Sequence, residues 1–111
     1  MRTVKLLMGE VAYGMTDLSG AASELLETVQ ETEVRRLAHR IFHAAVPSEL
    51  YTVSSLLEPI GPRWGSGITL RFFHRSFQEY FLATELVRRR QPAEGFPPSV
   101  KAFADDIAQA P

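Results

Sequence analysis

The residues best suited to chemistry lie together in one segment, FFHRSFQEYFLA, at residues 72–83. His74 follows alternating apolar residues, which predict a strand, and precedes an amphipathic stretch, which predicts a helix. Ser76 and Glu79 have the spacing of a capping box, in which the serine hydroxyl accepts a hydrogen bond from the N–H three residues on and the glutamate reaches back to the serine N–H. We therefore expect the helix to begin at Ser76, with His74 just outside it, near free N–H groups that favour an anion such as phosphate.

The motifs of a nucleotide-hydrolysing enzyme are absent. The sequence contains no G-x-x-x-x-G-K-S/T, so it lacks the backbone cradle and the lysine that hold the β- and γ-phosphates. Its glycine-rich segment, residues 61–67, has no lysine and precedes a predicted strand, so we interpret it as a turn. No apolar strand ends in acidic residues that could hold magnesium, and no serine lies in a nucleophile motif. The sequence therefore predicts no catalytic residue, no metal ligand and no cofactor for this chain alone.

Two histidines and three arginines gather in one predicted helix. His39 and His43 have a spacing that could ligate a metal, but no acidic third ligand is apparent, so we expect them to be solvated. Arg35, Arg36 and Arg40 make this helix basic, as in proteins that place a third helix in the major groove of DNA. A net charge of −1 argues against binding driven by phosphate neutralisation. We therefore favour a solvated face over a nucleic-acid contact.

Composition places the chain among ordinary globular domains. Its 111 residues suffice for a single core, and 45% hydrophobic with 23% charged residues are typical values. The absence of cysteine excludes disulfides and thiolate metal sites. No apolar run is long enough to span a membrane, and Glu10 interrupts the N-terminal apolar stretch, which disfavours a signal peptide. We expect a cytoplasmic protein.

Apolar periodicity predicts helices first and a hairpin afterwards. Helical spacing predicts three helices and a short helical piece, at residues 3–15, 18–29, 32–45 and 48–54. The period then changes to two, which predicts a β-hairpin with strands at residues 56–60 and 68–72. Trp64 lies at the tip of the connecting turn, where it either packs against the helices or is reserved for a neighbouring domain.

Two further helices follow the hairpin. A long helix over residues 77–90 is closed by Pro92, and residues 92–98 are typical of a stiff linker. Ser99 is a candidate N-cap for a last helix, with an apolar stripe made of Val100, Phe103 and Ile107. This stripe has little to pack against unless the helix folds back, so we expect it to be exposed and to promote self-association.

The segment at residues 72–83 resembles the end of the winged-helix domain of NACHT-type signalling NTPases, which belong to the STAND group. In that family a strand ending in Phe-apolar-His runs into Ser/Thr-Phe-Gln-Glu-aromatic, then an apolar pair and Ala. The matching residues are Phe72, Phe73, His74, Ser76, Phe77, Gln78, Glu79, Tyr80, Phe81 and Ala83. The resemblance covers roughly residues 4–90. It implies an α+β, mostly helical fold: a winged helix of three helices and a β-hairpin wing, with a long C-terminal helix and the first helix of a following helical domain.

The resemblance also implies a domain division and a role. Residues 1–91 would form the winged helix, residues 92–98 a linker, and residues 99–111 the truncated start of a helical domain. In the resembling receptors the position of His74 contacts the terminal phosphate of bound ADP and holds the closed, inactive state. The chain would then be a non-catalytic regulatory module that senses nucleotide state and controls opening and oligomerisation.

The implied partners follow from what the sequence lacks. ADP or ATP would be bound by an NTPase domain, in cis or in trans, and other protein partners would cover the exposed faces. We expect the chain to be a fragment or a truncated reading frame, because the phosphate-binding loop is missing. The alternative function is that of a winged-helix transcription regulator that binds DNA through its third helix and its wing.

Overall fold

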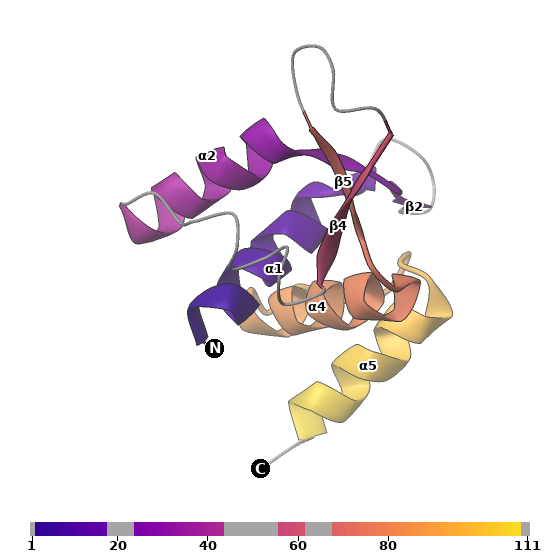
Figure 1. Ribbon diagram of the computed structural model, residues 1–111. Helices are drawn as coiled ribbons and strands as arrows, with labels where there is room; N and C mark the ends of the chain where they lie inside the picture. The colour runs from indigo at the N-terminus through magenta and orange to yellow at the C-terminus, as the bar shows by residue number, and fades with distance from the viewer. Residues whose placement is uncertain (1, 18–23, 44–55, 62–67, 110–111) are drawn as a thin grey trace.

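The computed structural model describes residues 2–17, 24–43, 56–61 and 68–109. Within these residues the fold is α+β and mostly helical, with four helices and a small three-stranded antiparallel sheet (Figure 1), as the sequence predicts at this level. The helices are α1 (Arg2–Gly14), α2 (Glu31–Phe42), α4 (Arg75–Arg88) and α5 (Pro98–Gln109). The strands are β1 (Thr16–Asp17), β2 (Glu24–Leu25), β3 (Val29–Gln30), β4 (Leu57–Ile60) and β5 (Thr69–Phe72).

The three-stranded sheet has the order β3-β5-β4, so β5 is its central strand. The predicted hairpin is confirmed, because β4 and β5 pair antiparallel with Leu57 opposite Phe72. Leu70 and Phe72 are buried while Arg71 between them is exposed, which is the alternation expected of a strand with one face on the core. Arg71 faces Glu58 across the hairpin and donates to its carboxylate at 2.5 Å. The turn that carries Trp64 lies outside the described residues.

The helix predicted over residues 18–29 is wrong for the part that the structure describes. β2 pairs antiparallel with β1, and β3 pairs antiparallel with β5 through Val29 opposite Leu70. Leu26 N also donates to Met15 O at 2.6 Å. Apolar residues here do recur at helical spacing, but partners far along the chain satisfy the backbone polar groups instead. Such tertiary pairing overrides a weak local preference.

The basic helix is shorter than expected. α2 begins at Glu31, one residue before the predicted start, and its N-cap Gln30 makes no side-chain capping bond. It ends at Phe42 rather than near residue 45, because His43 adopts a left-handed conformation with φ of 55°. The amide of His43 still donates to His39 O at 2.8 Å, which closes the last turn. The short helical piece predicted at residues 48–54 lies outside the described residues.

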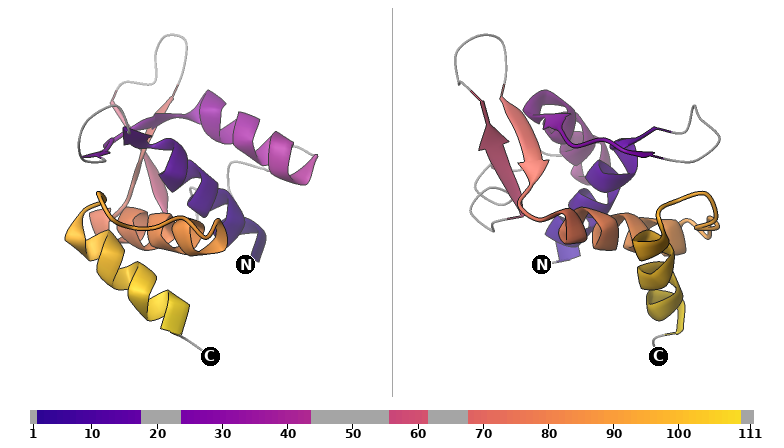
Figure 2. Two further views of the ribbon diagram at one scale, coloured as in Figure 1. Left: turned by 180° about the vertical axis from the view of Figure 1, so that it is seen from behind. Right: turned by 90° about the vertical axis from the view of Figure 1, so that its right-hand side faces the viewer.

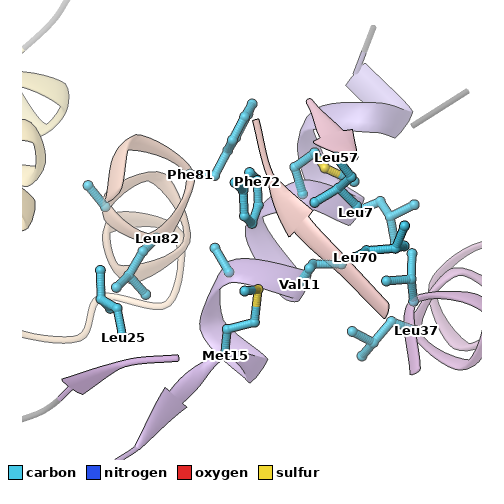
Figure 3. Packing of buried hydrophobic residues seen from close by; sticks show 14 of the residues in the cluster. Leu7, Val11, Met15, Leu25, Leu37, Leu57, Leu70, Phe72, Phe81 and Leu82 are labelled. Carbon is cyan, nitrogen blue, oxygen red and sulfur yellow. The ribbon is translucent and has the colours of Figure 1, made fainter. Parts of the chain in front are cut away.

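The core lies where α1 meets the sheet and the two neighbouring helices. Leu7 and Val11 on one face of α1, and Met15 directly after the helix, are almost completely buried. Figure 3 shows these side chains directed toward residues of β5, α2 and α4, including Leu70, Phe72, Leu37 and Leu82. The apolar spacing of the sequence therefore identifies the buried face of α1 correctly, and this single core holds the sheet against the helices.

α4 lies between α1 and α5 (Figures 1 and 2). α5 folds back on α4 and buries Val100 and Ala104, while Phe103 and Ile107 are partly buried against the core. The expectation of an exposed stripe is therefore wrong for Val100. Ser99 is not an N-cap, since the helix already begins at Pro98, and its hydroxyl donates to the carboxylate of Glu79 on α4. No helix within the described residues has both the length and the apolar character to cross a bilayer.

α4 lies close against α1 at Gly9. A Cβ atom on Gly9 would lie 3.0 Å from Glu85 Oε1, 3.5 Å from Glu85 Cβ and 3.7 Å from Phe81 O. By contrast, a Cβ atom on Gly14, at the end of the same helix, would meet nothing within 4 Å. The missing side chain of Gly9 is thus what lets the Glu85 carboxylate lie against the backbone of α1.

We predict that Gly9→Val lowers the free energy of unfolding by about 1–3 kcal/mol, the usual cost of overpacking a close contact. Gly14→Val is the matched control, because it places the same side chain on the same helix in open space, and it should change stability by less than about 0.5 kcal/mol. Urea denaturation measures both. Equal losses in the two variants would mean that the cost comes from valine in a helix and not from the contact with α4.

Candidate functional site around His74

The N-cap of α4 lies two residues before the predicted position, Ser76. His74 is its N-cap, with φ of −129° and ψ of 140°, and the carbonyl of His74 accepts from Phe77 N at 3.1 Å and from Gln78 N at 3.4 Å. No side chain caps this end of the helix, so the predicted capping box of Ser76 and Glu79 is wrong. Ser76 is already inside the first turn of the helix.

The side chain of His74 is exposed at this helix start. Its ring contacts two phenylalanines: the ring centroid of Phe73 lies 4.8 Å away with planes at 89°, and that of Phe77 lies 5.2 Å away with planes at 77°. Both phenylalanines are themselves exposed, at 49% and 37%. Sequence reasoning places His74 correctly outside the regular part of the helix, and the structure adds the two aromatic neighbours.

The remaining residues of the segment are divided between the core and the surface. Phe72, Phe81 and Ala83 are buried apolar residues. Gln78 is also buried, and its Nε2 donates to Leu26 O at 2.8 Å, which ties α4 to the chain just after β2. Glu79 is partly buried and accepts the hydroxyl of Ser99, as described above. The contacts of these residues hold α4 in place.

An apolar groove lies between the first turns of α4 and the side of α5. Its volume is about 400 Å³, and its lining consists of Leu56, Ser76, Phe77, Tyr80, Phe81 and Phe103. The rings of Tyr80 and Phe103 meet edge to face, with centroids 5.7 Å apart. A second hollow of about 280 Å³ lies at the same helix start and is lined by Glu27, Arg71, Phe72, Phe73, Arg75 and Gln78. Phe73 and Phe77, whose rings contact His74, therefore line one hollow each.

The structure also contains a charged cluster that the sequence did not predict. Glu85 of α4 is only 2% exposed, and it accepts from Arg88 Nε at 3.0 Å and from Arg89 Nε at 2.5 Å. Glu10 of α1 accepts from Arg88 and Arg89 at 2.9 Å each and from Arg40 of α2 at 3.1 Å. We call these five residues the glutamate–arginine cluster. It joins α1, α2 and α4 through one set of ion pairs.

Part of this cluster could be found from sequence. Glu85 precedes Arg88 and Arg89 by three and four residues, which is the spacing of neighbours on one helix face. Glu10 is more than seventy residues away from these arginines, and no local pattern relates them. The guanidinium of Arg89 also lies 4.0 Å from the ring centroid of Tyr13, whose hydroxyl donates to Gln91 at 2.8 Å. These contacts give Arg88 and Arg89 defined partners at the end of α4.

Charge pairing lowers the pKa of Glu85. Burial alone would raise the pKa of this carboxyl, but the hydrogen bonds and positive charges of Arg88 and Arg89 outweigh burial and hold the pKa below its ordinary value. The pKa of Arg88 is raised, chiefly by its hydrogen bond to Glu85. Glu85 and Arg88 are therefore both charged at neutral pH. They form a stabilising ion pair and are not suited to exchanging a proton with a substrate.

The basic residues of α2 are already paired. Arg35 pairs with Glu31, Arg36 donates to Glu33 at 2.8 Å, and Arg40 belongs to the glutamate–arginine cluster. His39 and His43 are exposed at the end of the helix. Within the described ranges, no group of three His, Asp or Glu residues could hold a metal ion.

The chain matches no protein-family model, and no curated protein and no solved structure shows significant similarity to it. What can be said about its function therefore depends on the residues and geometry described above.

We predict that Glu85→Gln lowers the free energy of unfolding at pH 7 by about 1–3 kcal/mol, the cost of weakening a buried charged hydrogen bond. The pKa of Glu85 is lower in the folded chain than its ordinary value of 4.5. The charged carboxylate therefore contributes fully to the free energy of unfolding above pH 4.5, and this contribution is lost as the pH falls through the lowered pKa. Denaturation at pH 7 and at pH 3 should therefore give a smaller difference between variant and native chain at pH 3. Exposed Glu24→Gln is the control, and a loss that is independent of pH would contradict the ion-pair account.

Proposed function

We propose that this chain is a non-catalytic regulatory module of a NACHT/STAND-type NTPase, in which it senses nucleotide state and controls the closed-to-open switch and oligomerisation. The observation that carries the proposal is the segment at residues 72–83, with the one histidine of that segment exposed at the N-cap of α4. A switch of this kind works by rotation of one domain against another, and the nucleotide biases two arrangements through contacts that it makes in only one of them.

The order of the described elements supports a winged-helix assignment. α1 is followed by three short strands, a second helix and a hairpin, and the last of the short strands, β3, pairs with β5, the second strand of the hairpin. A strand in this position, completing a sheet with the wing hairpin, is what a winged helix requires. The helix expected as the third one, over residues 32–45, corresponds to α2, and the helix expected before it, over residues 18–29, is not formed in residues 24–29.

The surroundings of His74 suit an anion. α4 is 14 residues long and has no acidic residue in its first turn, where Arg75 follows His74 directly. The N–H groups at a helix start and the helix dipole both favour negative charge. An exposed imidazole in this position has the chemistry to donate a hydrogen bond to a phosphate oxygen that a second domain presents. The remaining contacts to ADP or ATP would come from the NTPase domain, in cis or in trans.

The rival function, DNA binding by the basic helix, receives little support from the geometry. Arg35, Arg36 and Arg40 each pair with a carboxylate of α2 or α1. A phosphate backbone would have to displace those carboxylates, and the net charge of −1 offers no long-range attraction. We therefore keep the regulatory role as the proposal and treat DNA binding as its competitor.

The nucleotide proposal predicts a contrast between the chain alone and the chain within an NTPase. Alone, it should show no ATPase activity and no micromolar affinity for ADP by calorimetry, because His74 supplies one contact. In a full-length NTPase built around this segment, His74→Ala should raise basal activation, since it removes a contact made only in the ADP-bound closed state. The same substitution should leave the urea midpoint of the isolated chain nearly unchanged. Unfolding of the isolated chain, with unaltered basal activation of the full-length protein, would make His74 structural.

For DNA we predict weak binding without sequence preference that disappears at physiological salt. Arg36→Ala combined with Arg40→Ala should then change nothing measurable in a gel shift. A sharp, sequence-dependent shift at about 150 mM salt, near physiological ionic strength, that this double variant abolishes would favour the transcription regulator instead.

A further inference from the structure

The exposed aromatic residues around His74 are not explained by the core. Phe73 is 49% exposed and Phe77 is 37% exposed, although both belong to a segment whose other phenylalanines, Phe72 and Phe81, are buried. Single exposed apolar residues are common and need no explanation. These two share one neighbour, however, because the rings of both contact the ring of His74.

The contact geometry restricts the imidazole. Each phenylalanine ring lies nearly perpendicular to the ring of His74, at 89° and 77°, with centroids 4.8 and 5.2 Å away. Such edge-to-face arrangements are the preferred ones for aromatic pairs. Phe73 holds its place because it directly precedes the N-cap, and Phe77 because it lies in the first turn of α4. The two rings thus come from either side of His74 in the sequence and limit its rotation.

We propose that Phe73 and Phe77 are positioning residues, which hold the His74 imidazole in one orientation toward an anionic ligand. The inference rests on the proposed function for the identity of the ligand, a terminal phosphate. An exposed side chain normally loses its rotational freedom when it binds, and that loss weakens affinity. Rings that fix the imidazole before binding reduce the rotational entropy that is lost on binding. This would account for the two large apolar side chains that are exposed to solvent here.

The test uses the full chain and the ring signals of its three histidines in proton–carbon NMR spectra. His39 and His43 are exposed and serve as internal references. In the native chain the His74 ring signals should be displaced from the reference positions by ring currents, and Phe73→Leu and Phe77→Leu should each move them toward those positions. Tyr80→Leu is the matched control, because Tyr80 is also 37% exposed on α4 but its ring contacts Phe81 and Phe103.

Titration with inorganic pyrophosphate then separates the two levels of inference. Native His74 signals should respond, and the two leucine variants should bind about threefold to tenfold more weakly, the effect expected from mobilising one side chain. If the ring signals move in the variants but pyrophosphate affects His74 in none of the chains, the contact of the two rings with His74 stands and its positioning toward an anionic ligand is overturned. If both variants keep the native His74 signals, or Tyr80→Leu moves them equally, the positioning inference is overturned.

Discussion

The crossing of α1 and α4 at Gly9 is the contact on which the rest of the structure depends. Because Gly9 has no side chain, the carboxylate of Glu85 can lie against α1, with its nearest oxygen 3.0 Å from where a Cβ atom would be. A carboxylate in that position is costly unless it is paired, and Arg88 and Arg89 supply the pairing. The same two arginines reach Glu10 on α1, so one close helix contact and one set of ion pairs require each other.

The buried residues of β5 and those of α4 follow two different periodicities, which meet at the start of α4 and thereby fix the position of His74. Along β5 the side chains alternate, with Leu70 and Phe72 inside, so the strand cannot slide by one residue without exposing both. Along α4 the buried residues Gln78, Phe81, Leu82 and Glu85 recur at helical spacing. His74 lies between these two patterns, at the N-cap. The buried half of the segment therefore sets the position of its exposed half.

The sequence predicted those elements that carry their own periodicity. The buried face of α1, the hairpin of β4 and β5, and the helices α4 and α5 all follow from apolar spacing. Apolar spacing did not predict the strands β1, β2 and β3, because each has only two residues and depends on a partner elsewhere in the chain. The region of residues 24–30 carries apolar residues at helical intervals, and only the pairing with β1 and β5 decides that it is extended.

The candidate site was predictable to a similar extent. The position of His74 at a strand–helix junction follows from the change of period. The N-cap could not be predicted in this way. Ser76 and Glu79 have the correct spacing for a capping box, yet Glu79 accepts the hydroxyl of Ser99 on α5, and the N-cap lies two residues earlier, at His74. The ion pairs of Glu10 were also beyond prediction, because they join residues that are close only after α1 packs on α4. In both cases tertiary contacts settled which of several locally acceptable arrangements the chain adopts.

The exposure of His74 limits what it can contribute to the proposed switch. A hydrogen bond to a charged group is worth about 1.5–3 kcal/mol net, and the figure falls at an exposed position. Moving a two-state equilibrium from 1:99 to 99:1 requires about 5.5 kcal/mol of differential binding. One imidazole therefore cannot drive such a change alone, and most of the bias must come from contacts between the nucleotide, the NTPase domain and other parts of this chain. On this argument, His74 would adjust the balance between two states whose stability is set mainly by the interface around the nucleotide.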